Sequence, residues 1–298
     1  MSDIDVLVVG GVGVDTIVNV PHLPLPESDT VKVPPMHEYV AHTGNGVAMG
    51  LHRLGLGVHL VDTIGDDSRG RMILDHYRQA GLPFDHRVHP AGTRRSVNLV
   101  DPGGRRLSLY DGRQPAGDAP PSDLWLTPMG RARHVHASLV DWSRHALADA
   151  VAAGLTTSTD LHSWDGRDPY RQDFAFGADL VFMSASDLGD RREDVTAHVF
   201  EHGRARAVVV MDGGNGSFVA VRGEPSRHFP AVEVPPERVI DTNGAGDSYV
   251  AAFLWAWLRD RAWDECAAAG SLGGAHAVQT PGTHTSFIGE KELTGALD

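Results

Sequence analysis

The chain of 298 residues has almost no cysteine and no long apolar run, and both absences narrow its setting in the cell. Cys266 is the only cysteine, so no disulfide can form within the chain. No apolar stretch approaches the roughly 20 residues that a membrane-spanning helix needs. The acidic start at residues 1–5 lacks the basic segment that opens a secretory signal. We therefore expect a protein of the reducing cytoplasm without a membrane partner.

Positive charge is also scarce. Lysine and arginine number 26 against 39 aspartates and glutamates, which gives a formal net charge of −13. Nucleic-acid binding normally requires a basic surface, so we expect no nucleic-acid partner. An acidic protein that handles phosphates must hold them with local devices such as backbone amides, a helix N-terminus or a metal ion. The histidines do not predict a zinc site, because His134, His136 and His284 lack the closely grouped Cys and His partners of such a site.

What the sequence does contain is an alternation of short apolar segments with helical patterns. The strand-like segments are 5–9, 58–62, 133–137, 180–183 and 207–211. The helical patterns are found around 47–54 and 72–77 and at 143–153, 190–203, 247–260 and 263–279. Strands that alternate with helices predict an α/β fold, in which a mostly parallel central sheet is covered on both faces.

Residues 16–40 and 94–112 interrupt this alternation. Neither segment has the period of a helix, and the second contains Asp-Pro-Gly-Gly at 101–104 between two strand-like stretches, which is typical of a β-hairpin. We expect both segments to form a small β-sheet inserted in a single α/β domain of residues 1–298, and to act as a lid over a cleft. The alternative is a surface hairpin without a role in the site.

The segment most informative about chemistry is Asp-Thr-Asn-Gly-Ala-Gly-Asp at 241–247. The apolar pair Val239 and Ile240 precedes it, which predicts a short strand, and the apolar stretch 248–258 follows it. A helix that is apolar on all sides is buried, and burial would hold its N-terminus rigidly. The segment therefore predicts a fixed helix start directly after a glycine-containing turn.

Such a helix start is suited to bind phosphate. Gly244, Ala245 and Gly246 present little side chain, so their backbone N–H groups, at the positive end of the helix dipole, would form an anion hole. Asp247 follows in the first turn, where it would act as the catalytic base and accept the proton of a hydroxyl that attacks a phosphoryl group. In the alternative, Asp247 only caps the helix.

Two other nucleotide-binding patterns are excluded. The sequence Gly-Val-Gly-Val-Asp-Thr at 11–16 begins like a dinucleotide-binding fingerprint, but Thr16 replaces its third glycine and no helix clearly follows. The Gly-x4-Gly-Lys-Ser/Thr pattern of P-loop kinases occurs nowhere in the chain. We therefore expect neither a Rossmann dehydrogenase nor a P-loop kinase.

The motifs together resemble the ribokinase-like (PfkB-type) family of sugar and nucleoside kinases. Segment 241–247 is similar to the signature of that family, 65–70 to its Gly-x-Asp-x-x-Gly turn, and 279–282 to a late turn near the adenine. The resemblance covers nearly the whole chain and implies a three-layer α/β/α core with a small β-sheet lid. It also implies ATP as phosphoryl donor and a monovalent cation such as K⁺ near Asp241 and Gly282. Phosphoryl transfer further calls for Mg²⁺ to neutralise phosphate charge.

Further site residues follow from the resemblance alone. Asp15 matches an aspartate that holds substrate hydroxyls. The nucleotide contacts that it implies are Ser184, Asp187, Met211, Gly213, Gly216, Thr242 and Ser271. Ser184 replaces the asparagine of the family's Asn-x-x-Glu motif. Asp187 replaces its glutamate with a carboxylate side chain that is one methylene shorter, and this carboxylate would act indirectly on magnesium. Met211 departs as well, because the nucleotide loop of the family usually begins with threonine.

The segment expected to bind the acceptor, at 41–46, differs most from the family pattern. Counting back from the following helix places Ala41 and His42 at the family's Gly-Gly and Gly46 at its asparagine. We expect Gly44 and Asn45 to take over the contacts with the acceptor. His42 is expected to be a histidine of a surface loop; the alternative is a contact with the substrate.

The function expected from all these features is ATP-dependent phosphorylation of a hydroxyl on a small sugar. A nucleoside acceptor, as in adenosine kinases, is the first alternative, because the altered acceptor segment could admit a base. A non-catalytic sugar-binding protein that kept the fold is the second. The lid strands leave edges that commonly pair, so a homodimer through the lid is also expected. Arg105 and Arg106, at the hairpin of the lid, are expected to be solvated; the alternative is contact with a ligand when the lid closes.

Overall fold

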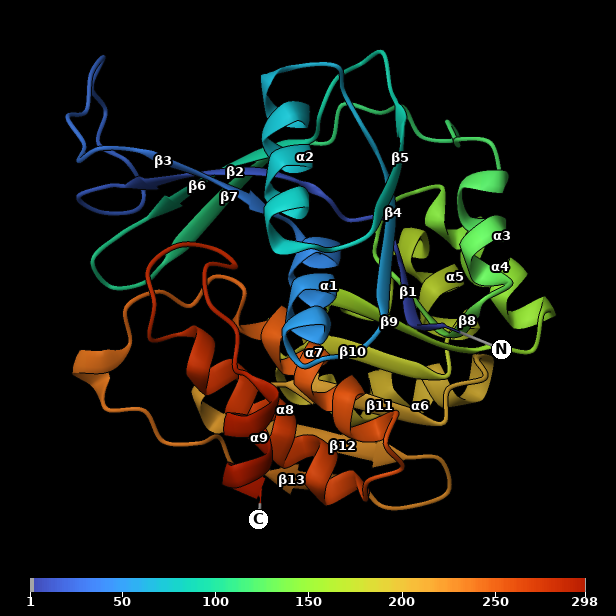
Figure 1. Cartoon of the computed structure of the whole chain (residues 1–298). Coiled ribbons are helices and arrows are strands. Elements are labelled where there is room, and N and C mark those ends of the chain that lie inside the picture. Colours follow the sequence, from blue (N-terminus) through green and yellow to red (C-terminus); the bar gives the residue numbers. More distant parts are fainter. Residues whose placement is uncertain (1–2, 298) are drawn as a thin grey trace.

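A nine-stranded sheet runs through the centre of the molecule, whose computed structural model describes residues 3–297 (Figure 1). Its strands are β1 Ile4–Val9, β4 Val58–Ile64, β5 Phe84–Val88, β8 Ala132–Ala137, β9 Thr156–Ser163, β10 Leu180–Ser184, β11 Ala207–Met211, β12 Ser217–Val221 and β13 Arg227–Phe229. They lie in the order β13-β12-β11-β10-β9-β8-β1-β4-β5. The pairs β11–β12 and β12–β13 are antiparallel, and the other neighbouring strands of this sheet are parallel. The predicted α/β fold with a mostly parallel sheet is confirmed.

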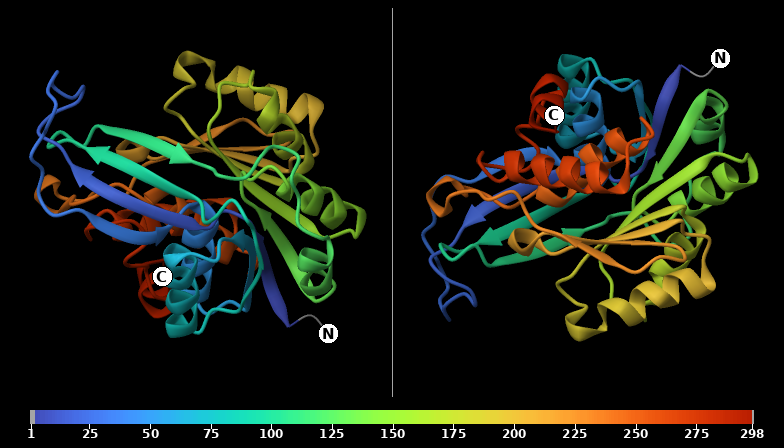
Figure 2. Two further views of the ribbon diagram at one scale, coloured as in Figure 1. Left: turned by 90° about the horizontal axis from the view of Figure 1, so that it is seen from above. Right: turned by 90° about the horizontal axis from the view of Figure 1, so that it is seen from below.

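Helices cover both faces of this sheet, as Figure 2 shows from two sides. The helices are α1 Thr43–Arg53, α2 Ser68–Ala80, α3 Asp123–Met129, α4 Ser143–Ala152, α5 Gln172–Gly177, α6 Arg192–His202, α7 Ala245–Trp257, α8 Trp263–Ala277 and α9 Glu290–Leu297. On one face, α7 packs between α1 and α8, and α9 packs on α8. On the other face, α3 to α6 pack in sequence. The molecule therefore has the three layers expected, with helices on both faces of the sheet.

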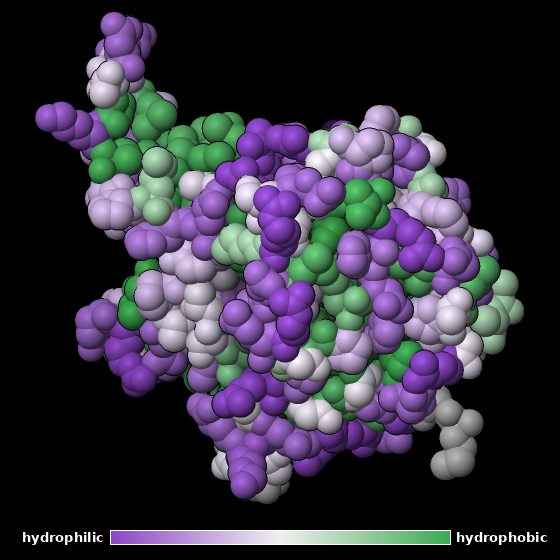
Figure 3. All heavy atoms as spheres, turned by 45° about the horizontal axis from the view of Figure 1, so that its top comes forward, coloured by the Kyte–Doolittle hydropathy of each residue, from purple (hydrophilic) through white to green (hydrophobic). Residues whose placement is uncertain are grey.

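A second, four-stranded sheet projects from one end of the core (Figure 1). Its strands are β2 Gly13–Asn19, β3 His37–Ala41, β6 Arg95–Val100 and β7 Arg106–Asp111, in the order β3-β2-β6-β7. The antiparallel pair β6 and β7 forms the hairpin that the turn sequence predicted. Figure 3 shows apolar surface gathered on this projecting part, where Leu107 and Leu109 of the edge strand β7 are exposed. We call this second sheet the lid.

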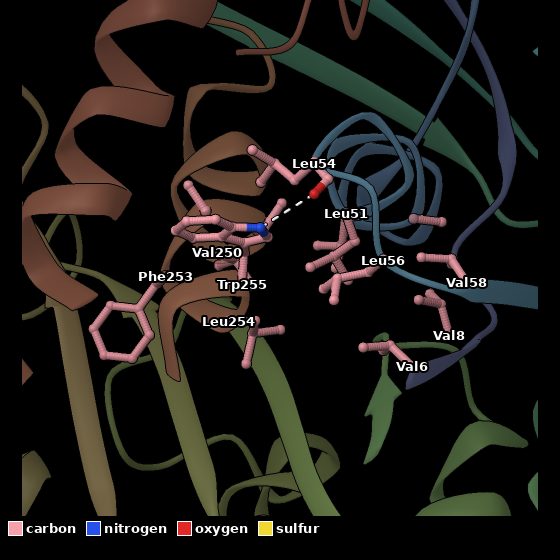
Figure 4. Close-up of a cluster of buried hydrophobic side chains, with 14 of the residues drawn as sticks. Val6, Val8, Leu51, Leu54, Leu56, Val58, Val250, Phe253, Leu254 and Trp255 are labelled. Atoms are coloured by element: carbon pink, nitrogen blue, oxygen red, sulfur yellow. Dashed lines mark hydrogen bonds between the residues drawn. The ribbon is translucent and has the colours of Figure 1, made fainter. Parts of the chain in front are cut away.

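Helix α7 is anchored in the largest apolar cluster of the core. Its residues from Val250 to Ala256 are all buried, and they pack with side chains of α1, β1 and β4 (Figure 4). The indole N–H of Trp255 also donates a hydrogen bond of 3.1 Å to the carbonyl oxygen of Leu54, at the end of α1. The expected burial of this helix is therefore observed, and it fixes the N-terminus that the site uses.

The strand expected before α7 is absent from the structure. Val239 and Ile240 lie in an irregular segment and are 42% and 59% exposed. The backbone N–H of Ile240 donates instead to the carbonyl oxygen of Val278, just after α8, at 2.8 Å. The strand predicted from these two β-branched residues is therefore wrong. A strand also needs a neighbouring strand edge, and this segment meets the end of a helix.

Candidate active site

A cleft of about 910 Å³ opens where the parallel strands end at their carboxyl termini, beneath the lid. The segments after β1, β8, β9, β10 and β11 all contribute to its walls, and β6 and β7 of the lid contribute from above. Of the predicted site residues, the following line it: Asp15, Ser184, Met211, Thr242, Gly244, Gly246 and Asp247. The fold therefore brings the base, the anion hole and part of both predicted binding regions together.

The start of α7 has the geometry that an anion hole requires. Gly244 is the N-cap residue and has a φ of 78°, in the left-handed region that favours glycine. The first backbone N–H groups of a helix have no acceptor within it, so those of Gly246 and Asp247 are free to meet an anion. The N–H of Ala245, which was predicted to take part, donates instead to the carbonyl oxygen of Thr242 at 3.4 Å. A side chain at Gly246 would meet no atom closer than the methyl carbon of Met211, at 3.8 Å. Phosphoryl oxygens can therefore approach the backbone here.

The turn that leads into α7 is held by Asp241. One carboxylate oxygen accepts from the backbone N–H and the side-chain amide of Asn243, at 2.9 and 2.7 Å. The other accepts from the backbone N–H of Gly282 at 3.1 Å, which ties the late turn to the anion hole. The signature segment at 241–247 and the late turn at 279–282 are therefore joined by hydrogen bonds through Asp241.

Asp247 lies at the floor of the cleft and is 8% exposed. Its Oδ2 is 2.7 Å from Nε2 of His284, whose side chain is 1% exposed. No other hydrogen bond to Asp247 side-chain oxygens occurs among residues 3–297, so Oδ1 is left to face the cleft. A carboxylate in this position can accept a proton from a hydroxyl group beside the anion hole.

Asp15 and His42 form the acceptor side of the cleft. Asn98 donates to Oδ2 of Asp15 at 2.9 Å, and Nε2 of His42 lies 3.2 Å from Oδ1, which has no aligned hydrogen-bond donor. Burial alone would raise the pKa of Asp15, but hydrogen bonding and the charge of His42 lower it overall. Asp15 is therefore a carboxylate on the wall of the cleft, with one buried oxygen that lacks a hydrogen-bond donor among residues 3–297.

His42 was not predicted to belong to the site. Its φ of 71° and ψ of 159° fall in a region that is almost restricted to glycine, where strain costs roughly 1–3 kcal/mol. The imidazole lies over Gly13, contacts Ser96 at 3.2 Å and is 5.7 Å from the ring centre of Tyr110 in the lid. The expectation of a surface-loop histidine is wrong, because this side chain lines the cleft and joins the core to the lid.

Gly44 and Asn45 do not line the cleft, contrary to the expected contact with the acceptor. Asn45 is fully buried, and its side chain is occupied by Val40, Tyr77 and His284. Gly44 faces the carbonyl oxygen of Gly10, which would lie 1.8 Å from an added Cβ. Both residues therefore support the site from behind, because their side of α1 packs into the core.

A buried ion pair stabilises the acceptor side. Arg94 donates to both carboxylate oxygens of Asp62, at 2.9 and 2.8 Å, and to the carbonyl oxygen of Val12 at 3.1 Å. Burial would lower the pKa of Arg94, but Asp62 raises it overall, so the guanidinium stays charged. The pair ties β6 of the lid to β4 and to the start of β2, which positions Asp15.

A second carboxylate reaches the cleft from the end of β9. Asp160 is 5% exposed and accepts from the backbone N–H of His162 at 2.9 Å. Burial raises the pKa of Asp160; the charge of His162 opposes this rise, whereas the charge of Asp247 adds to it. The two carboxylates are thus close enough for the charge of Asp247 to raise the pKa of Asp160.

The predicted nucleotide residues divide between the cleft and its surroundings. Ser184 and Met211 pair in register at the ends of β10 and β11 and line the cleft. Gly213 opens the short helical turn after β11, and an added Cβ there would meet open space. Gly216 has a structural role as well, because a Cβ would lie 2.1 Å from the carbonyl oxygen of Phe229.

Two other predicted residues lie outside the cleft. Asp187 is exposed beyond the end of β10 and has no hydrogen bond or ion pair within residues 3–297. Ser271 lies on α8, where its hydroxyl accepts from the backbone N–H of Val232 at 2.7 Å. This bond fixes the segment before α7, so a contact of Ser271 with the nucleotide stays a prediction.

The lid reaches the anion hole through Arg106. This side chain lines the cleft and donates to Oδ1 of Asn243, in the turn before α7. Arg106 is exposed, as expected, and it also bonds the turn before α7. No local sequence pattern predicts this contact, because it joins residues 137 positions apart. Arg105, by contrast, pairs with Asp101 in its own hairpin.

Comparisons with known proteins agree with this geometry. Residues 3–288 match the model of the pfkB family carbohydrate kinases. The chain is 42% identical to an acarbose 7(IV)-phosphotransferase of Actinoplanes sp., with 97% of each chain covered. The solved structure of a microbiome-derived acarbose kinase, Mak1, is 51% identical, covers 99% of each chain and superposes with a TM-score of 0.92.

A more distant structure shows the fold alone. Ribokinase of Arabidopsis thaliana, solved with ribose and ATP, is 22% identical and superposes with a TM-score of 0.83 over 100% of this chain and 99% of that one. None of the helices in the described residues is long and apolar enough to cross a membrane. The site, the fold and the relatives together show that the chain belongs to the pfkB family of carbohydrate kinases, which are ATP-dependent phosphotransferases that act on an alcohol group.

Proposed function

We propose that the chain phosphorylates a hydroxyl of an acceptor larger than one sugar ring, of the acarbose type. The observation that carries this proposal is the extent of the cleft. Its volume of about 910 Å³ is near the upper end of the usual range for small-molecule sites, and it continues from Asp247 to Asp141, Tyr170 and Gln114. The names of the two relatives with acarbose activity support the same acceptor.

The far part of the cleft suits a chain of sugar rings. Tyr170 is 36% exposed and offers an aromatic face, while Asp141 and Gln114 offer polar groups to hydroxyls. Asp15 and His42 would hold the ring whose hydroxyl reacts, because they line the wall of the cleft under the lid. A single sugar ring would leave the region around Tyr170 unfilled.

The reaction would take place between Asp247 and the anion hole. Oδ1 of Asp247 takes the proton from the acceptor hydroxyl, whose oxygen then attacks the γ-phosphorus of ATP in line. The bond from that phosphorus to the bridging oxygen breaks, and ADP leaves. The backbone N–H groups at Gly246 and Asp247 stabilise the charge on the transferred phosphoryl oxygens. Ser184, Met211, Gly213 and Thr242 would border the nucleotide.

Magnesium is the ion that this chemistry calls for. Asp187, exposed and without a hydrogen bond or ion pair within the described part of the chain, lies outside the cleft, so an indirect role on Mg²⁺ through water stays a prediction. Mg²⁺ would neutralise charge on the phosphates. A monovalent cation near Asp241 and Gly282, and a location in the cytoplasm with its supply of ATP, stay predictions.

The test is ADP release from ATP and Mg²⁺ with a panel of acceptors: acarbose, maltotetraose, ribose and adenosine. We expect turnover with acarbose or maltotetraose to exceed that with ribose and adenosine. Asp247→Asn should lower kcat by about 100-fold or more, because the base is lost. Asp194→Asn, on the exposed surface of α6, is the matched control and should leave kcat unchanged.

Different outcomes contradict different parts of the proposal. A preference for ribose or adenosine would refute the extended acceptor and leave the mechanism intact. Full activity of Asp247→Asn would refute the mechanism. Absence of turnover with every acceptor, while ATP still binds, would instead support a non-catalytic sugar-binding protein.

A further inference from the structure

His284 lies directly behind the carboxylate assigned as the base. Its Nε2 is 2.7 Å from Oδ2 of Asp247, and its side chain is almost completely buried, at 1% exposure. The histidine follows the late turn at 279–282, whereas Asp247 opens α7, so the contact joins two separate segments of the site. None of the motifs read from the sequence gives this residue a role.

The partners of His284 determine which ring nitrogen carries the proton. The amide nitrogen of Asn45 donates to the carbonyl oxygen of Val40 at 3.2 Å, so this side of the amide is the NH₂ group. The same nitrogen is 3.1 Å from Nδ1 of His284, which must therefore accept. Nε2 then carries the proton and donates to Asp247. The imidazole is neutral in this arrangement, because a proton on Nδ1 would face the NH₂ group.

Tyr77 fixes the amide from the other side. Its hydroxyl donates to Oδ1 of Asn45 at 2.9 Å. Burial raises the pKa of Tyr77 well above its ordinary value, and the charge of Asp62 adds to the rise, so the phenol keeps its proton. A directed chain of hydrogen bonds therefore runs from Tyr77 through Asn45 and His284 to Asp247, with every donor and acceptor assigned.

Glycines shape the slot that holds the imidazole. A Cβ at Gly46 would lie 2.3 Å from Nε2 of His284, and a Cβ at Gly244 would lie 2.6 Å from its Cδ2. Phe287 stacks on the ring, with 6.0 Å between ring centres and 17° between the planes. Gly46 stands where the sequence comparison with the family pattern placed an asparagine. The altered segment at 45–46 thus makes room for His284 and supplies its partner.

We propose that His284 is the positioning residue of the catalytic base. Donation from Nε2 holds Oδ2 of Asp247 away from the cleft, so that Oδ1 faces the acceptor hydroxyl and takes its proton. A neutral donor stabilises the carboxylate form without cancelling its negative charge. This inference rests on the proposed role of Asp247, but it assigns no contact between His284 and the substrate.

The experiment compares His284→Gln with His284→Asn. The amide nitrogen of glutamine can reach the position of Nε2 and still donate to Asp247, whereas that of asparagine is one methylene short. We expect His284→Gln to keep kcat within about threefold. We expect His284→Asn to lower kcat about 10- to 100-fold, the range for one hydrogen bond to a charged group, with the KM for ATP nearly unchanged. His76→Asn, at a histidine whose Nε2 has no hydrogen-bond partner among residues 3–297, is the control and should behave as wild type.

The pH dependence of kcat separates positioning from a general loss of structure. Without the donor the carboxylate binds its proton more readily, so the acid limb of the kcat profile should move to higher pH in His284→Asn and stay in place in His284→Gln. Thermal unfolding of both variants shows whether each is folded. Wild-type kcat and an unmoved acid limb in a folded His284→Asn enzyme would overturn the inference. Full activity of Asp247→Asn would instead refute the role of Asp247 as the base. The two variants therefore distinguish failure of the positioning role of His284 from failure of the proposed mechanism.

Discussion

Arg106 of the lid donates a hydrogen bond to Asn243, in the turn before the anion hole. Its guanidinium bonds Asn243 and lines the cleft close to where the γ-phosphoryl group would lie. A fixed positive charge there would stabilise the transferred phosphoryl group. We expect Arg106→Gln to lower kcat by roughly 100-fold, the usual cost of one such donor.

Arg105→Gln is the matched control for Arg106→Gln. Arg105 belongs to the same hairpin, but its guanidinium pairs with Asp101 outside the cleft. Steady-state kinetics of both variants with the same acceptor should show a loss only at Arg106. Equal losses would mean that the hairpin as a whole, and not the charge at Arg106, supports the reaction.

Single residues also show what sequence reasoning can and cannot reach. Asp247 and its glycines were predictable because their roles depend on one continuous segment, a turn followed by a helix. His42, Asn45 and His284 were not, because their contacts depend on how distant segments pack. The hydrogen bond from Asn45 to His284 joins residues 239 positions apart, and no local pattern records it.

At the scale of elements, the start of α7 requires a glycine at position 244. Gly244 has a positive φ, and an added methyl group would meet His284 at 2.6 Å. We expect Gly244→Ala to lose about 1 kcal/mol of stability through its backbone and to lower kcat at least tenfold, because the methyl group displaces His284 or the turn. Kinetics and thermal unfolding on the same preparation measure both effects.

Gly154→Ala is the control for the backbone cost alone. Gly154 follows α4, has a φ of 74°, and an added Cβ there would meet no atom within 4 Å. The Gly154→Ala variant should lose about as much stability as Gly244→Ala and keep the wild-type kcat. Equal kcat in the two variants would contradict the role given to the slot around His284.

Elements were also the scale at which the sequence was most informative. Alternation of apolar strands and helices predicted the parallel sheet, because that pattern reflects burial on both faces. The predicted hairpin became β6 and β7, because its turn residues act locally. Val239 and Ile240 were the failure, since an apolar pair forms a strand only beside another strand.

At the scale of the whole molecule, the lid lines the cleft on one side and has an unpaired edge strand on the other. Strand β7 pairs only with β6 within the sheet, and its Leu107 and Leu109 are exposed. The homodimer expected from the sequence would cover this edge. It stays a prediction, because the structure contains one chain.

The stability of the whole fold should depend on two histidines inside the central sheet. His134 and His136 on β8 are fully buried and share the hydroxyl of Ser158, at 2.7 and 2.9 Å. Burial lowers the pKa of His134 to about 3, with the charge of His136 adding to the shift. Burial lowers the pKa of His136 to about 4, although Asp247 partly opposes this. Both side chains are therefore neutral in the folded protein at moderately acidic pH.

The unfolded chain protonates these histidines near pH 6.5, so it binds up to two more protons than the folded protein between pH 6.5 and 4. Stability must then fall as the pH falls through this window, by up to about 1.4 kcal/mol per pH unit for each histidine. We expect His134→Gln to remove about half of this contribution, as measured by urea unfolding at several pH values. His145→Gln, at an exposed histidine, should leave the slope unchanged. An identical slope in His134→Gln and wild type would show that the sheet does not exclude the proton, because the penalty for charging the buried pair would then be absent.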